Sequence, residues 1–347
     1  AVLVGMGLFT TAAIADDGLY GQMRWRWEGW KNALDANSDR DDGFGYNFLR
    51  TRLGYSHDIG EKGMFNMSIE NTRVMGYDAF LGMYPEGPYT KADVAPWYVQ
   101  AQDRMIVHEA YMGISDFLFE GFDAYAGRFS LSYGRERVIG PNDWVFYAEN
   151  RFDGFKGHYT FEKGWLDLMC LKLWENFAQK YDYYDGEGEG DFDMRGLYAH
   201  FDAQEGFYVE PYILWLTQDN WNDTEDEEAW DGVELKNDSF FVFGALVDYM
   251  SDMGLHLYGE ALIESGTLHD LDWDEGEVVT DDVDISGLGA YVGAFYEFDS
   301  TVKPYLGVEF NYASGTSMDD YNDNKWKTFR SPFGSYGSYM GVMNMVD

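Results

Sequence analysis

The chain has 347 residues, 18% of them aromatic, and its 62 acidic residues against 24 basic ones give a net charge of −38. The charge excludes nucleic acid as a partner, the aromatic content excludes a disordered chain, and a mean hydropathy of −0.41 without a long apolar run excludes a helical membrane protein. The 40 glycines and the many aromatic residues of this polar chain favour an all-β protein, and an ordinary secreted one is the first alternative.

The first fifteen residues, AVLVGMGLFTTAAIA, resemble the apolar core of a secretory signal. Small residues at Ala13-Ile14-Ala15 would form the cleavage site, and acidic residues follow at once. We therefore predict a partial signal peptide over 1–15 and an exported chain from Asp16; the alternative is an apolar N-terminal strand. Cys170 is the only cysteine, so neither an intrachain disulfide nor a cysteine-based metal site is expected.

Downstream of Leu19 the chain repeats segments in which apolar and polar residues alternate. In 19–30, Leu19 and Met23 share one face while Arg24 and Arg26 share the other, a period of two that predicts a β-strand. The same pattern predicts fourteen strands: 19–30, 46–59, 64–74, 105–115, 122–130, 152–162, 165–177, 192–202, 206–218, 239–250, 254–265, 285–298, 302–314 and 334–346.

The links between these strands alternate between short and long. The short ones are 60–63, 116–121, 162–164, 203–205, 251–253 and 299–301, and the long ones are 31–45, 75–104, 131–151, 178–191, 219–238, 266–284 and 315–333. This alternation is typical of a transmembrane, antiparallel, up-and-down β-barrel with short periplasmic turns and long extracellular loops. We therefore predict one barrel domain over 16–347 in a bacterial outer membrane, in contact with lipid and lipopolysaccharide, with the charged strand face toward the lumen.

Acidic residues concentrate in the predicted long loops, at 182–193, 219–238, 269–284 and 319–323. Such loops are either solvated, mutually repelling segments or binding sites for divalent cations. Carboxylates and an amide alternate at Asp35, Asn37, Asp39 and Asp41 as in a calcium loop, although Gly43 comes too late for the EF-hand pattern. Calcium in these loops is the only metal that the sequence indicates, and no other cofactor is predicted.

Basic residues have a different distribution, because eleven of the thirteen arginines lie at or before Arg151. The alternation places Arg24, Arg26, Arg50, Arg52 and Arg128 on polar strand faces, where neighbouring strands would bring the first four together. Clustered guanidinium groups bind planar anions such as carboxylates. Later strands carry acidic residues on the polar face, at Glu210, Asp248, Glu260, Glu264 and Glu309, so charge pairing that merely stiffens the barrel is the alternative.

Catalysis is not expected. Of the six histidines, His57 and His108 fall on the predicted lipid-facing side of their strands, and no Ser-His or Asp-His pattern repeats at a barrel rim. An outer-membrane hydrolase is therefore only a minor alternative.

One stretch resembles a known family. Residues 127–154 read GRFSLSYGRERVIGPNDWVFYAENRFDG and are similar to the signature of the alginate-export family of outer-membrane porins. The matching elements are Gly127-Arg128, Tyr133-Gly134 with Arg137, Ile139-Gly140, Asp143-Trp144 and Arg151-Phe152-Asp153-Gly154. The strand LRTRLGYSHDIG and the segment Glu109-Ala110-Tyr111 resemble two earlier strands of the family.

The resemblance implies a monomeric barrel of about 18 strands whose constricted lumen is lined by arginines that select an anionic polyuronate. Carried over by motif, Arg128 and Arg151 would face the lumen, with Asp153 as an acidic partner. Arg137, in the same signature, is also predicted to line the pore. The chain departs from the family in that its acidic lumen residues and loops are unusually numerous for an exporter of a polyanion. Only fourteen strands are visible where the family has about four more, which suggests a fragment that lacks both ends.

The leading functional hypothesis is a passive porin for anionic solutes, such as an alginate-like polysaccharide or sugar acids. The alternative is a structural barrel that sheaths a secreted or electron-transfer partner, with a periplasmic protein bound to it. The chain has no Cys-x-x-Cys-His motif, so a haem would belong to that partner.

Overall fold

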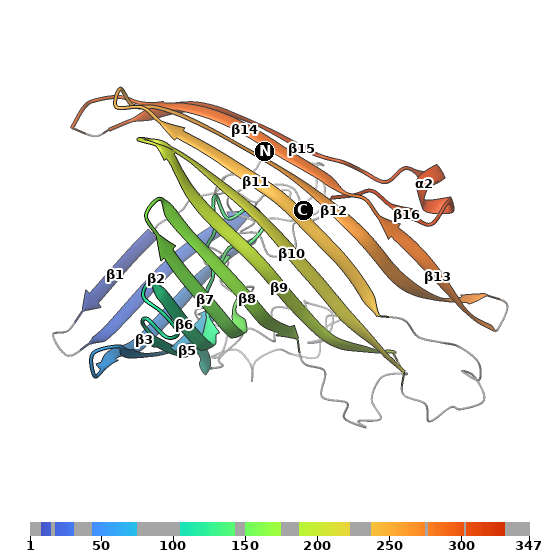
Figure 1. The fold of residues 1–347 in the computed structure, drawn as a ribbon, viewed down its shortest axis with the longest axis horizontal. Helices are drawn as coiled ribbons and strands as arrows, with labels where there is room; N and C mark the ends of the chain where they lie inside the picture. The colour runs from blue at the N-terminus through green and yellow to red at the C-terminus, as the bar shows by residue number, and fades with distance from the viewer. Residues whose placement is uncertain are drawn as a thin grey trace. The chain divides into compact units, whose positions relative to one another are not determined.

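The computed structural model describes residues 8–14, 18–30, 44–74, 105–142, 150–174, 187–222, 237–274, 277–301 and 303–329, most of which lie in long β-strands (Figure 1). The strands are β1 (Leu8–Ile14), β2 (Leu19–Trp30), β3 (Phe44–Ile59), β4 (Gly63–Val74), β5 (Met105–Ile114), β6 (Phe122–Phe129), β7 (Phe152–Phe161), β8 (Gly164–Trp174), β9 (Glu187–Gln204), β10 (Phe207–Asn222), β11 (Asp238–Met250), β12 (Leu255–Asp274), β13 (Glu277–Ile285), β14 (Leu288–Glu297), β15 (Tyr305–Ala313) and β16 (Lys325–Trp326). Within these ranges, no helix is long and apolar enough to cross a membrane.

The chain forms two compact units. Unit 1 comprises Ala1–Ile114, Gly127–Arg151 and Pro332–Asp347, and unit 2 comprises Ser115–Ala126 and Phe152–Ser331.

In unit 1, strands β1 to β5 pair in chain order, each antiparallel to the next. A tight turn at 60–62 joins β3 to β4, and the register runs from Ile59 opposite Gly63 to Phe48 opposite Val74. The polar and apolar alternation of the sequence therefore continues across neighbouring strands, because residues paired in register lie on the same face.

In unit 2, strands β7 to β12 also follow one another in antiparallel order (Figure 1). Short turns join β7 to β8, β9 to β10 and β11 to β12. Together with unit 1, this order confirms the predicted all-β, antiparallel, up-and-down fold. Thirteen of the fourteen predicted strands coincide with observed ones, namely β2 to β12, β14 and β15. The fourteenth, at 334–346, lies outside the described residues.

The predicted loop 266–284 is wrong. Strand β12 continues to Asp274, and β13 and β14 pair with it in one unbroken register, from Asp274 opposite Glu277 to Leu255 opposite Tyr296. The acidic residues of this stretch alternate with strand-forming ones such as Val279 and Val283, so an extended hairpin satisfies the backbone there in spite of the charge. Strands β9 and β10 likewise extend into the predicted loops 178–191 and 219–238.

Residues after β15 form a small folded element inside the predicted loop 315–333. Helix α2 (Met318–Asn322) begins with a capping box, in which the Asp320 N–H donates to Ser317 Oγ at 3.1 Å and the Ser317 N–H donates to the Asp320 carboxylate at 3.3 Å. Hydrogen bonds from Lys327 and Ser317 lower the pKa of Asp320 to about 2.

The N-terminal residues of the described chain take part in the sheet. Leu8–Ile14 forms β1 and pairs with β2, with Ile14 opposite Tyr20. The proposed cleavage of residues 1–15 concerns processing and stays a prediction.

Candidate functional site

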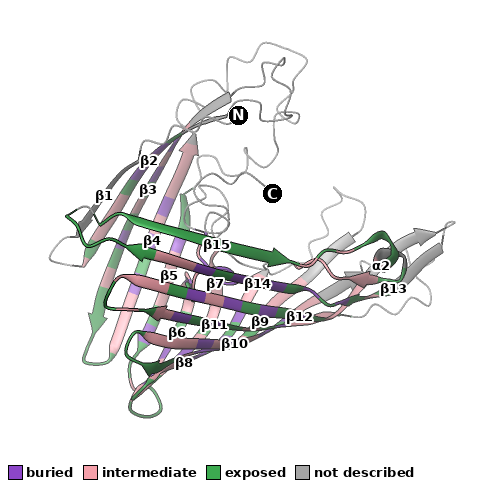
Figure 2. Cartoon of the chain, turned by 90° about the horizontal axis from the view of Figure 1, so that it is seen from above, coloured by how far each residue is buried: buried purple, intermediate pink, exposed green. Residues whose placement is uncertain are grey.

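Exposure along the strands is inverted relative to a water-soluble sheet. On β2, Met23 is 51% exposed whereas Arg24 and Arg26 are 8% and 5% exposed, and on β3, Leu53 is 50% exposed whereas Arg50 is fully buried. Figure 2 shows the same alternation of buried and exposed residues on strands of both units. We call the side with the buried charged residues the inner face and the other side the outer face.

Arginines gather on the inner face of unit 1. Arg24 on β2 lies opposite Arg50 on β3, and Arg52 lies opposite Gln22 on one side and Glu70 of β4 on the other. Arg26 lies opposite Phe48, and its guanidinium carbon stands 5.5 Å from the centre of that ring. The structure thus brings together the four arginines that the alternation placed on one wall.

A connecting segment covers part of this wall. The sequence predicts an extracellular loop over 131–151, but within it Leu131, Tyr133, Val138 and Ile139 are at most 8% exposed. Apolar side chains in the described part of this predicted loop are therefore buried instead of facing water. We call residues 130–142 and 150–151 the inward segment.

His108 is the second correction. Strict alternation puts it on the outer face, yet it is only 6% exposed. The register between β4 and β5 shifts at this point, since Ser68 pairs with Glu109 and Ile69 pairs with Val107, which leaves His108 as an extra residue on β5. Such a β-bulge re-aims a side chain, and here it turns the imidazole toward Ser68, whose Oγ lies 3.0 Å from Nδ1.

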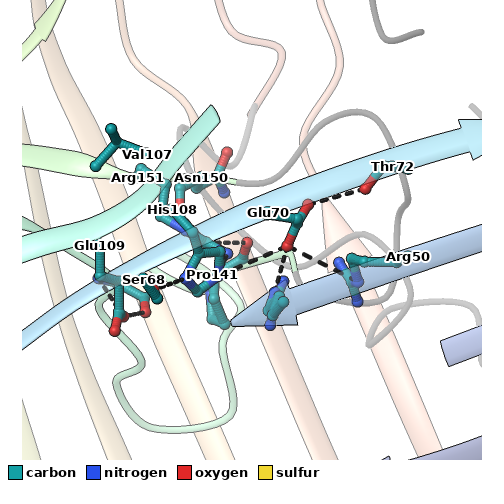
Figure 3. A network of polar contacts seen from close by, with 12 residues as sticks. Arg50, Ser68, Glu70, Thr72, Val107, His108, Glu109, Pro141, Asn150 and Arg151 are labelled. Carbon is teal, nitrogen blue, oxygen red and sulfur yellow. Dashed lines mark hydrogen bonds and ion pairs between the residues drawn. The ribbon is translucent and has the colours of Figure 1, made fainter. Parts of the chain in front are cut away.

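Glu70 is the hub of the charged network on this face (Figure 3). Its carboxylate accepts hydrogen bonds from Arg52 Nε and, at 2.9 Å, from Thr72 Oγ1. Arg50 Nε and His108 Nε2 lie 4.0 and 3.9 Å from the same carboxylate. One buried carboxylate therefore offsets the charges of two neighbouring guanidinium groups, as burial of like charges requires.

His108 and Glu109, the two residues at the bulge, bind the two end residues of the inward segment, Ser130 and Arg151, which we call its stems. Glu109 accepts hydrogen bonds from the hydroxyl and, at 3.3 Å, from the backbone N–H of Ser130. The Arg151 Nη2 group bonds His108 Nε2 (Figure 3). Arg151 Nη1 also donates to the carbonyls of Asn150, at 2.6 Å, and Pro141, at 3.3 Å. Arg151 therefore links two parts of the inward segment to each other and, through His108, to β5.

The remaining predicted site residues are dispersed. Arg128 donates to the Val107 carbonyl at 3.4 Å, and Arg137 is buried within the inward segment. Asp153 belongs to unit 2, where it lies opposite Lys172 of β8. The calcium candidates Asp35, Asn37, Asp39 and Asp41 lie outside the described residues, and the described ones contain no group of three or more metal-binding side chains.

The inner face of unit 2 is acidic instead. Glu210, Asp248, Glu260 and Glu264 are at most 7% exposed, whereas Glu309 on β15 is exposed. Tyrosine hydroxyls hold three of these carboxylates: Tyr198 donates to Glu210, Tyr212 and Tyr291 donate to Glu260, and Tyr258 donates to Glu309.

Histidines pair with carboxylates at the short turns of unit 2, a feature that sequence reasoning missed. His158 bonds Asp167 at 2.5 Å, His200 bonds Glu210 at 2.7 Å and His256 bonds Asp248 at 2.5 Å, one pair in each of the three turn-linked hairpins. The sequence did contain a signal for these pairs, because each histidine and its carboxylate partner fall on the same face of adjacent strands.

An antiparallel up-and-down sheet whose apolar residues face outward and whose charged residues face inward defines an outer-membrane channel of the β-barrel class. The chain matches the family model "Alginate export" over residues 22–346. It therefore belongs to the alginate export family, whose members are outer-membrane channels.

The chain also aligns with solved porins at low sequence identity. OmpF of Salmonella typhi, solved with daunomycin, is 15% identical over 92% of this chain and 97% of its own, with a TM-score of 0.37. OprB of Pseudomonas putida is 11% identical over 89% of this chain and 78% of its own, with a TM-score of 0.46. No curated protein matches the sequence.

Proposed function

We propose that this channel carries anionic solutes, specifically acidic sugars and uronate polymers of the kind for which the family is named. The observation that carries the proposal is the excess of positive charge on the inner face of unit 1. The wall and the inward segment hold seven arginines, Arg24, Arg26, Arg50, Arg52, Arg135, Arg137 and Arg151, against three glutamates, Glu70, Glu109 and Glu136.

Buried charges act on a solute through the potential they create, because walls of low dielectric constant focus field lines into the lumen. The Arg52 side chain keeps 12% of its surface exposed and Arg151 is half-buried, so these two can also meet a carboxylate directly. A guanidinium group binds a carboxylate with two parallel hydrogen bonds, which suits the repeated carboxylates of a polyuronate. By the same proposal, the long connections lie on the extracellular side.

The test is the reversal potential of single channels of the full chain in planar bilayers under a potassium chloride gradient. We expect anion preference in the wild type and a fall of roughly threefold or more in the chloride-to-potassium permeability ratio of Arg24→Gln/Arg52→Gln. Arg195→Gln is the matched control, since this arginine lies on the outer face over the Trp215 ring, and it should leave the ratio unchanged. Cation preference in the wild type, or an unchanged ratio in the double variant, would refute the proposal.

A further inference from the structure

We propose that His108 is a proton-responsive positioning residue, which holds Arg151 against the wall when neutral and releases it when protonated. The inference deepens the proposed function, on which it rests in one respect: protonation of His108 adds positive charge to an anion-selective lumen.

The hydrogen bonds of His108 define its protonation state. An arginine guanidinium has donors and no acceptor, so the contact with Arg151 Nη2 makes His108 Nε2 the acceptor. The single ring proton must then sit on Nδ1, where Ser68 Oγ at 3.0 Å accepts it. His108 is therefore neutral in this arrangement, with both of its nitrogens used.

A second proton can enter only on Nε2. That atom would then become a donor facing another donor, and two positive charges would meet without an acceptor between them. The Glu70 carboxylate, which is an acceptor, lies 3.9 Å from Nε2. Protonation thus favours a turn of the imidazole toward Glu70 and separation from Arg151, and it raises the charge of the cluster by one.

The surroundings of His108 contain charged groups of both signs. Glu70 comes from β4, Arg50 and Arg52 come from β3 and approach through Glu70, Glu109 is its neighbour on β5, and Arg151 comes from the inward segment. Histidine is the side chain whose charge changes most readily between pH 5 and 8.

Arg151 matters because it closes one end of the inward segment. The Asn150 N–H donates to the Pro141 carbonyl at 2.9 Å, and Arg151 Nη1 donates to the same carbonyl. The other stem is held at Ser130 by the Glu109 carboxylate. Protonation of His108 would therefore loosen one stem and leave the other attached.

The experiment measures the reversal potential of the full chain in planar bilayers between pH 7.5 and 5. In the wild type we expect the chloride-to-potassium permeability ratio to rise by roughly two- to threefold toward acid pH. His108→Gln keeps a neutral acceptor at every pH and should flatten this profile at the neutral-pH value. His108→Lys carries a permanent charge and should give the acid-pH value throughout.

His57→Gln is the matched control, because it removes an exposed histidine from the outer face of β3 and should leave the wild-type profile intact. Histidines of unit 2 are present in all variants, so their contribution is common to every profile. A wild type without pH dependence, or a folded His108→Gln with the wild-type profile, would overturn the inference. If His108→Gln does not fold, His108→Asn replaces it and the same outcomes apply.

The two proposals fail separately. A channel that prefers cations at every pH, but loses its pH response in His108→Gln, would refute anion selectivity and keep the role of His108. An anion-selective channel whose ratio does not change with pH would do the reverse.

Discussion

Glu70 is the residue on which the charged groups of unit 1 converge. Its side chain is 3% exposed, and Arg52, Arg50 and His108 all lie within 4.0 Å of its carboxylate. Removal of one partner from a buried ion pair leaves an uncompensated charge, which costs more than the pair itself contributes. A neutral residue at this position would leave several buried guanidinium groups to repel one another.

We therefore predict that Glu70→Gln lowers the free energy of unfolding by about 3 kcal/mol. Urea titration of the protein folded into phospholipid vesicles measures this change. Glu61→Gln, in the exposed turn between β3 and β4, removes the same charge where water screens it, and should change stability by less than about 0.5 kcal/mol. Equal effects of the two substitutions would mean that Glu70 is not the hub of the network.

At the scale of elements, a recurring contact of a tyrosine side chain links three neighbouring strands. A tyrosine ring lies over a glycine of the next strand, and its hydroxyl reaches a polar side chain on the strand beyond. The three cases are Tyr20, Gly54 and Asn66; Tyr212, Gly244 and Glu260; and Tyr258, Gly293 and Glu309. Glycine is required because a Cβ at each of these positions would lie 2.2 Å from the tyrosine ring.

The second prediction follows from this contact. Gly244→Ala must displace the Tyr212 ring and break its bond to Glu260, so we expect a loss of about 2 kcal/mol. Gly259→Ala on the adjacent strand β12 is the control, since its Cβ would approach no atom closer than 3.4 Å. Tyr212→Phe tests the mechanism: if the hydroxyl bond carries the effect, Gly244→Ala should cost less in the Tyr212→Phe background.

Sequence periodicity predicted the regular strands well, but it failed where a strand is irregular. Strand β2 was predicted with its observed bounds, 19–30, because a period of two depends only on local residues. The bulge at His108 shifts that period by one residue, and its cause lies in the pairing with β4, which no local pattern contains. The burial of Leu131 and Ile139 was missed for a related reason, since a loop and an inward segment have the same composition until their contacts are known.

At the scale of the whole molecule, the outer face is apolar in both units. Met23 and Leu53 in unit 1 and Leu197 and Phe243 in unit 2 are 40% to 51% exposed. Exposed side chains of this size on every second residue would be a liability in water, whereas in a bilayer they contact hydrocarbon and stabilise the folded state. The outer face and the charged inner face therefore depend on the same membrane environment.

Leu197 offers the sharpest test of that environment, because it lies in the middle of β9, between Leu168 of β8 and Ile213 of β10 in register. We predict that Leu197→Arg lowers the free energy of unfolding from phospholipid vesicles by about 2–4 kcal/mol, since an arginine near the bilayer midplane must leave water. Gln204→Arg makes the same change of charge at the exposed end of the same strand and should cost only about 0–1 kcal/mol. Reversible urea unfolding in vesicles gives both values. Similar losses at the two positions would mean that the outer face of β9 meets water along its length, and the membrane orientation of this sheet would have to be rejected.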